Sequence, residues 1–195
     1  MYYIQFLMLT FPISSVILVS SKRRYERMKA NYEERAKKFI AQVYPYIKNC
    51  RDNFDFELAI HQFNKLNHRK VQVAYGSTRI ALITSDYVIK VDYDGWGTGI
   101  FGSCKSEVRM YRQAKRDGFD YLLAKITPYR QKYNRTFYIM PRIKGVGRTP
   151  WDADFYLTNT EEDWVEEHIG DLHNENYGWK NGHIVIIDYA HNDLK

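Results

Sequence analysis

The sequence predicts an α+β fold, and three patterns support this prediction. Apolar residues recur at helical spacing from Tyr25 to Ile47, which is typical of an amphipathic helix. Two short β-rich runs in VQVAYGSTRIALIT (71–84) lead to a third strand pattern at 87–93. A helix-like run, SCKSEVRMYRQAKR (103–116), follows these strands. The length of 195 residues suits one compact unit, or one domain with an extension.

The part of the chain before these strands is expected to be helical. The helix over 25–47 should end or kink near Pro45, because proline lacks the N–H that a helix interior needs. FELAIHQFNKL (56–66) is a second amphipathic stretch. We therefore expect residues 28–70 to form a helical amino-terminal extension that packs on the sheet.

The carboxyl end, GDLHNENYGWKNGHIVIIDYA (170–190), carries the most specific pattern. Asp171, Asn176 and Asp188 follow one another 5 and then 12 residues apart. Their side chains are oxygen donors, which suit Mg²⁺, a hard cation. The Asn-Gly dipeptide at 181–182 lies between strand-like runs and predicts a tight hairpin turn.

A short helix is expected just before this pattern, over TEEDWVEEHI (160–169). Thr160 and Asp163 fit a capping box loosely, because aspartate stands where glutamate or glutamine is usual. This helix would lead the chain into the segment that begins at 170.

Further up the chain, two residues complete a constellation. Lys90 lies in the middle of the strand pattern 87–93, and Glu107 follows it by 17 residues in the helix-like run. A lysine in a strand is a weak signal alone, but here it precedes Asp171, Asn176 and Asp188 in a fixed order. This set resembles the catalytic core of the protein-kinase-like superfamily. The D-L-H-x-x-N spacing is closest to aminoglycoside-phosphotransferase-type members and to small kinase-like proteins encoded by phages.

The resemblance covers about Val71 to Ala190 and implies a two-part organisation. Residues 71–143 would form a kinase-like small lobe, with an antiparallel sheet and one key helix. Residues 144–195 would form a strongly truncated large lobe with the catalytic loop, since only seven residues follow Asp188.

The resemblance also implies ATP and Mg²⁺ as ligands. Lys90 would contact the α- and β-phosphates, and Glu107 would hold this lysine. Main-chain groups near 141–143 would meet adenine. Gly76 and Ser77 would cover the phosphates, and Met140 and Ile143 would line the adenine pocket. Asn176 and Asp188 would bind the metal ion. Asp171 would orient the acceptor hydroxyl, and His173 would touch the transferred phosphoryl group.

The implied function is ATP- and Mg²⁺-dependent phosphoryl transfer to a hydroxyl of a protein Ser/Thr residue or of a small molecule. The alternative is a pseudokinase that binds nucleotide or a partner protein without catalysis. A different alternative is a dinucleotide-binding turn, because Gly97–Gly102 reads G-x-G-x-x-G after a strand, with Asp117 and Asp120 further on. That alternative leaves Lys90 and the carboxyl-terminal pattern unexplained.

The net charge of +6 is local, since residues 22–38 hold eight basic and three acidic side chains. The favoured interpretation is a solvated helix face, with a membrane-surface or nucleic-acid contact as less favoured alternatives. Two cysteines, Cys50 and Cys104, have no metal-ligand spacing and suit a reducing compartment. A cytoplasmic location is therefore expected.

The first 27 residues differ from the rest. Residues 4–20 are almost wholly apolar, but Pro12 interrupts them and a basic flank follows at 22–24. We consider three interpretations: a spurious extension upstream of a true start at Met28, a membrane anchor that leaves the remainder in the cytoplasm, or a packed strand or helix.

Overall fold

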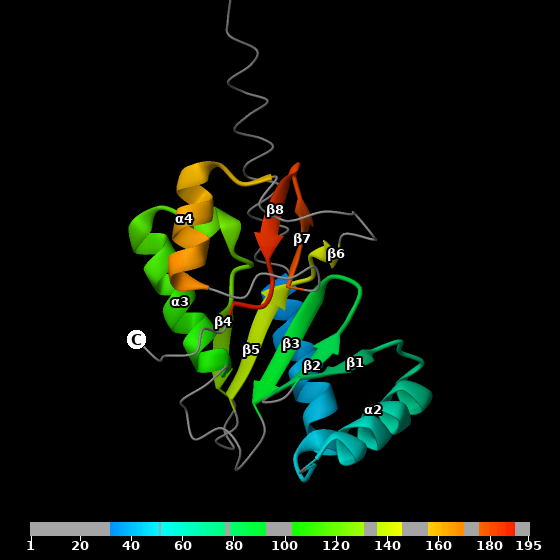
Figure 1. The fold of residues 1–195 in the computed structure, drawn as a ribbon. Helices are drawn as coiled ribbons and strands as arrows, with labels where there is room; N and C mark the ends of the chain where they lie inside the picture. Colours follow the sequence, from blue (N-terminus) through cyan, green and yellow to red (C-terminus); the bar gives the residue numbers. More distant parts are fainter. Residues whose placement is uncertain are drawn as a thin grey trace, which may run out of the picture.

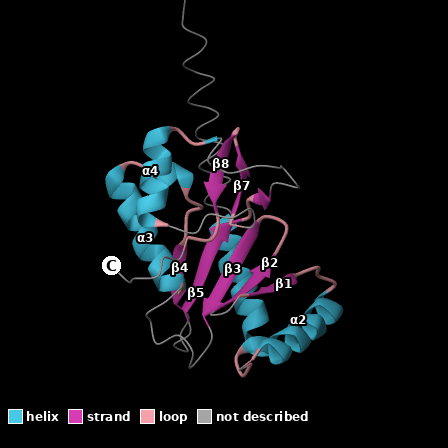
Figure 2. Cartoon of the chain, in the orientation of Figure 1, coloured by secondary structure: helices cyan, strands magenta, loops and turns pink. Residues whose placement is uncertain are grey.

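The computed structural model describes residues 32–50, 52–76, 79–92, 103–130, 136–145, 156–169 and 176–189. The predicted α+β class is confirmed: two antiparallel sheets combine with several helices (Figures 1 and 2). The apolar segment predicted over residues 1–27 lies outside the described residues. Within the part of the chain that is described, no helix is long and apolar enough to cross a membrane.

The larger sheet has five strands in the order β1-β2-β3-β5-β4, and all neighbours in it are antiparallel. Side chains alternate between its two faces, as in any strand. Ile89 and Val91 therefore point into one apolar cluster, whereas Lys90 points to the opposite face. The strands are Gln72–Tyr75, Arg79–Ile83, Tyr87–Asp92, Thr127–Arg130 and Thr136–Pro141 for β1 to β5.

Two amino-terminal helical segments cover the first face of this sheet. One spans residues 32–47, and the other is α2 (Asn53–Asn67). Asp52 caps α2, since its carboxylate accepts from the Asp55 N–H at 2.9 Å. The two helical segments meet edge-to-face through Phe39 and Phe63, with ring centroids 5.5 Å apart. They share an apolar cluster with the sheet, which we call the amino cluster, so the expected packing of this extension on the sheet is present.

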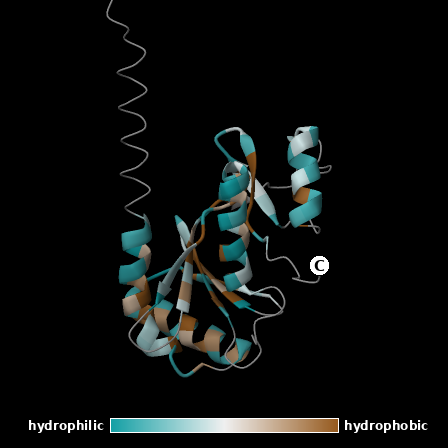
Figure 3. Ribbon diagram, turned by 90° about the vertical axis from the view of Figure 1, so that its left-hand side faces the viewer, coloured by the Kyte–Doolittle hydropathy of each residue, from teal (hydrophilic) through white to brown (hydrophobic). Residues whose placement is uncertain are grey.

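Helix α3 (Cys104–Asp117) lies on the second face of the sheet (Figure 1). Ser103 caps its start, and Gly118 ends it in the left-handed conformation with φ 85°, which glycine adopts without strain. The 3₁₀ turn η1 (Asp120–Leu122) follows. Figure 3 shows hydrophobic residues, in brown, both on the strands and on helices that pack against them.

A smaller sheet of three strands follows in the chain, in the order β6-β7-β8. Its strands are Lys144–Gly145, Tyr177–Lys180 and His183–Ile186. The predicted hairpin turn is confirmed: Asn181 and Gly182 join β7 to β8, and both have positive φ, 54° and 84°. This sheet, α3, η1 and helix α4 (Asn159–His168) enclose a second apolar cluster, the carboxyl cluster.

The predicted cap of α4 is wrong in position. The helix begins at Asn159, so Thr160 lies inside it, and the capping box is formed by Thr158 and Glu161. Glutamate at this position has the length to reach back to the cap N–H, and its Oε2 accepts from the Thr158 N–H at 2.7 Å.

The corrected cap gives a first prediction. Thr158→Ala should lower the free energy of unfolding by about 1 kcal/mol, because it removes an acceptor for an orphan helix N–H. Thr160→Ala is the matched control, and should change that free energy by less than about 0.5 kcal/mol. Urea unfolding of both variants checks this, and equal effects at the two threonines would contradict the assignment of the cap.

Candidate functional site

A buried ion pair joins the sheet to α3. Lys90 Nζ on β3 lies 2.6 Å from Glu107 Oε1 on α3, and both side chains are buried. Lys90 Nζ also donates to the Ile187 carbonyl at 2.9 Å, beyond the end of β8. The contact predicted between Lys90 and Glu107 is thus present, and it lies where three separated segments of the chain meet.

Local structure explains why Glu107 faces Lys90. The Cys104 N–H donates to Asp92 Oδ1 at 3.0 Å, which ties the start of α3 to the end of β3. Glu107 lies in the first turn of the helix that Ser103 caps, and so it stands one turn from this anchor. The sequence between the two elements, 93–102, lies outside the described residues, but the anchor fixes how they meet.

Asp188 reaches the same site from the carboxyl-terminal hairpin. The Asn176 carbonyl accepts from the N–H groups of Ile187 and Asp188, at 2.6 and 3.3 Å. These bonds close the base of the hairpin just beyond β7 and β8. They bring the two predicted metal ligands, Asn176 and Asp188, next to one another.

Arg79, at the start of β2, is a member of this site that sequence reasoning missed. Its guanidinium contacts the Asp188 carboxylate and lies 3.7 Å from Glu107 Oε1. The available signal was strand alternation: Ala81 pairs with Lys90, so Arg79, two residues earlier, projects from the same face as the lysine. The pairing register, which the sequence alone does not provide, is needed to see this.

Two positive and two negative side chains therefore form one cluster, the ionic cluster, made of Arg79, Lys90, Glu107 and Asp188. Burial raises the pKa of Glu107, and the charges of Lys90 and Arg79 offset only part of this rise. Burial acts in the same direction on Asp188, but Lys90 and Arg79 outweigh it and hold the pKa of that carboxyl below its ordinary value. Asp188 is thus an anion at neutral pH, with Arg79 as its cationic partner.

The residues present are chemically suited to Mg²⁺. Asp188 and Asn176 offer oxygen donors, which this ion prefers. The Asp188 side chain is 40% exposed, so it is only partly covered by the protein. Among the described residues no group of three or more His, Cys, Asp or Glu side chains forms a metal cluster. Asp171 and His173 lie outside the described residues.

The predicted adenine segment has fewer open main-chain donors than expected. Pro141 has no N–H, and the Arg142 N–H donates to the Asp86 carbonyl at 3.0 Å. The Ile143 N–H is the donor that the prediction then needs. Met140 and Ile143 are both buried in the carboxyl cluster.

The predicted phosphate-covering turn lies between β1 and β2. The Gly76 N–H donates to the Arg79 carbonyl at 2.9 Å, so the chain on either side of residues 77–78 is joined by a main-chain hydrogen bond. A Cβ at Gly76 would meet that carbonyl at 3.5 Å, an ordinary contact, so space does not require glycine there. Ser77, the other predicted member of the turn, lies outside the described residues.

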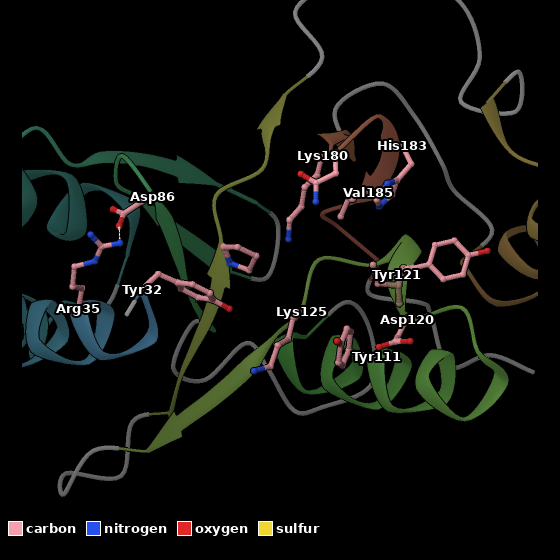
Figure 4. A pocket seen from close by; sticks show the side chains of 13 residues that line it. Tyr32, Arg35, Asp86, Tyr111, Asp120, Tyr121, Lys125, Lys180, His183 and Val185 are labelled. Carbon is pink, nitrogen blue, oxygen red and sulfur yellow. Dashed lines mark ion pairs between the residues drawn. The ribbon is translucent and has the colours of Figure 1, made fainter. Parts of the chain in front are cut away.

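A cavity of about 470 Å³ is lined by residues from several elements (Figure 4). It opens between the helix of residues 32–47, the end of β5, η1 and the β7–β8 hairpin. Tyr32, Tyr111 and Tyr121 are among its lining residues, and Arg35 pairs with Asp86 at its edge. Its lining includes none of the four charged residues of the ionic cluster, so its volume does not bear on their chemistry.

The alternative of a dinucleotide-binding turn does not fit the architecture. Gly97–Gly102 lies outside the described residues, but Asp117 on α3 accepts from Trp164 Nε1 at 3.1 Å and from Gln113. All pairs of named strands in the described chain are antiparallel, whereas that turn connects parallel strands.

Comparison with known proteins adds no relative to this description. No protein-family model matches the chain, and no curated protein matches it at a significant level.

Proposed function

We propose that this protein is a kinase-like phosphotransferase that uses ATP and Mg²⁺. One observation carries the proposal: Lys90 on β3 lies 2.6 Å from Glu107 on the following helix. In protein kinases a β3 lysine and a helix glutamate form such a pair, and an aspartate beside them holds the metal ion. Asp188, which shares the ionic cluster here, has the chemistry for that third role.

Each residue has a defined part in this proposal. Lys90 offsets the charge of the α- and β-phosphates, and Glu107 fixes the position of its ammonium group. Asn176 and Asp188 would hold Mg²⁺, which would supply positive charge to neutralise the phosphate oxygens. Asp171 orients the acceptor hydroxyl and takes its proton on a carboxylate oxygen. Positioning and charge neutralisation then provide most of the rate acceleration.

The acceptor is an alcohol, either a Ser/Thr side chain of a protein or a small molecule. The D-L-H-x-x-N sequence at 171–176 supports the second choice as well as the first, since aminoglycoside kinases share it. The same resemblance suggests a phage-encoded protein. A protein that consumes ATP would work in the cytoplasm, and the basic segment 22–38 does not by itself call for a nucleic-acid partner.

A second candidate function is nucleotide binding without transfer. The observation that favours it is the contact between Arg79 and Asp188, because a guanidinium on this carboxylate opposes metal binding there. A pseudokinase of this type would bind nucleotide or a partner protein and leave the γ-phosphate intact.

Incubation with γ-labelled ATP and Mg²⁺ tests the proposal and separates the two candidates. The wild-type protein should transfer label to itself or to an added alcohol, and Asp171→Ala should reduce this transfer to background. The variant should still bind Mg²⁺-ATP, because Asp171 acts on the acceptor. Equal labelling of wild type and variant would remove Asp171 from the mechanism, and binding without any labelling would favour the second candidate.

A further inference from the structure

We propose that Arg79 competes with the metal ion for Asp188, and that its guanidinium passes to the nucleotide phosphates when the metal binds. This inference rests on the proposed function, and it assigns to Arg79 a positioning role that the kinase resemblance does not supply. Arg79 would set the metal concentration at which the site fills, and would occupy the Asp188 carboxylate when no metal is bound.

The location of Arg79 gives it access to both partners. It is the first residue of β2, and its carbonyl accepts from the Gly76 N–H across the β1–β2 turn. Its main chain is therefore part of the turn predicted to cover the phosphates. Its side chain is only 11% exposed and extends into the ionic cluster, where it contacts Asp188. Lys90, to which the proposed function assigns the phosphates, projects from the same face of the sheet as Arg79, so a rotation of the Arg79 side chain would exchange the carboxylate for a phosphate.

The charges favour such an exchange. The ionic cluster is balanced as it stands, with two cations facing two carboxylates. A divalent cation on Asp188 adds positive charge beside Arg79 and repels the guanidinium. A bound nucleotide adds negative charge next to it, and arginine binds phosphate with two parallel hydrogen bonds. Metal and nucleotide together therefore separate Arg79 from Asp188, and neither ligand alone does so as well.

A purely structural role for Arg79 predicts the opposite effect on metal binding. If the guanidinium only held Asp188 in position, its removal would free the carboxylate and weaken metal binding. If it competes with the metal, its removal strengthens metal binding. The sign of the change thus distinguishes the two roles.

The test is a titration of the full chain with Mn²⁺, a paramagnetic substitute for Mg²⁺, in the absence of nucleotide, followed by the electron-spin resonance signal of free Mn²⁺. Arg79→Met should bind Mn²⁺ at least about tenfold more tightly than the wild type, since a close competing charge is removed. In EDTA, where Arg79 stays on Asp188, the same variant should bind ADP nearly as the wild type does. Arg79→Lys keeps the charge and should bind Mn²⁺ nearly as the wild type does.

Two further variants serve as a substitute and as a control. Arg79→Gln also lacks the charge but keeps hydrogen-bond donors, so it replaces Arg79→Met if that variant does not fold. Arg112→Met, on the exposed side of α3, removes the same charge away from the cluster and should leave both affinities unchanged.

The outcomes separate this inference from the proposed function. Unchanged or weaker Mn²⁺ binding by the neutral Arg79 variants, with the wild type binding Mn²⁺ and ADP, overturns the competition and leaves the proposed function standing. Mn²⁺ binding by the neutral variants alone supports the competition and favours the inactive candidate. If no form binds Mn²⁺ or ADP, both the inference and the proposed function fail.

Discussion

Lys90→Met should lower the free energy of unfolding by about 3–5 kcal/mol at pH 7, because it leaves a buried carboxylate without its closest cation. Glu107 is fully buried, and Lys90 Nζ lies 2.6 Å from it. Arg79, at 3.7 Å from the same oxygen, offsets only part of the loss. The second oxygen of Glu107, Oε2, is buried and has no hydrogen-bond partner among the described residues, so no hydrogen bond at this oxygen compensates for the lost lysine.

The size of this loss should depend on pH. The pKa of Glu107 is raised by burial and lowered by Lys90, so it rises further when the lysine is removed. A carboxyl with a raised folded-state pKa gives its full stability below its unfolded pKa, and this stability falls as the pH rises through the folded pKa. The deficit of Lys90→Met should therefore be small near pH 4, close to the unfolded glutamate pKa of about 4.3, and grow toward neutral pH.

Urea unfolding between pH 4 and pH 8 measures both effects. Lys90→Met/Glu107→Met should recover most of the stability, because replacing both partners removes the unpaired charge. Lys105→Met removes an exposed lysine from the same helix and should cost less than about 0.5 kcal/mol. A pH-independent deficit, or a double variant as unstable as the single one, would show that the ion pair is not the cause.

Asp188→Asn should remove most of the stabilisation that Mg²⁺-ATP gives to the fold. A ligand at a hundred times its dissociation constant adds about 2.7 kcal/mol to the free energy of unfolding. Asparagine keeps the shape of Asp188 but not the charge that a metal ion requires. The variant also loses its ion pair with Arg79, so each protein has to be compared with and without ligand.

Thermal or urea unfolding in the presence and absence of Mg²⁺-ATP checks this expectation. Asp163→Asn is the matched control, since this aspartate is exposed on α4, and its shift should equal that of the wild type. If Asp188→Asn and the wild type shift equally, the metal is not held at Asp188, and the assignment of Asn176 as its neighbour in the site loses its basis.

The sequence predicted those features of the fold that depend on local pattern. The Asn181–Gly182 turn was predictable because its backbone requires positive φ at both residues. The contact of Lys90 with Glu107 was implied by the resemblance to protein kinases, in which a strand lysine pairs with a helix glutamate. The position of the α4 cap was missed by two residues, since Thr158 and Thr160 both suit a cap and only the structure shows where the helix begins.

The role of Arg79 was not predictable, for a physical reason. Its contact with Asp188 spans 109 residues and depends on the register of β2 against β3 and on the path of the chain after β8. Neither is encoded in a local pattern. The hydrogen bond from Arg142 to Asp86, which engages one of the expected adenine donors, is likewise a tertiary contact.

The core is divided into an amino cluster and a carboxyl cluster, and each contains one cysteine that can report on local opening of that cluster. Cys50 is buried in the first cluster and Cys104 in the second. Burial raises the pKa of the Cys104 thiol well above its ordinary value, which suppresses the reactive thiolate. Alkylation of each cysteine therefore requires its own half of the molecule to open, and the two alkylation rates report separately on the two halves.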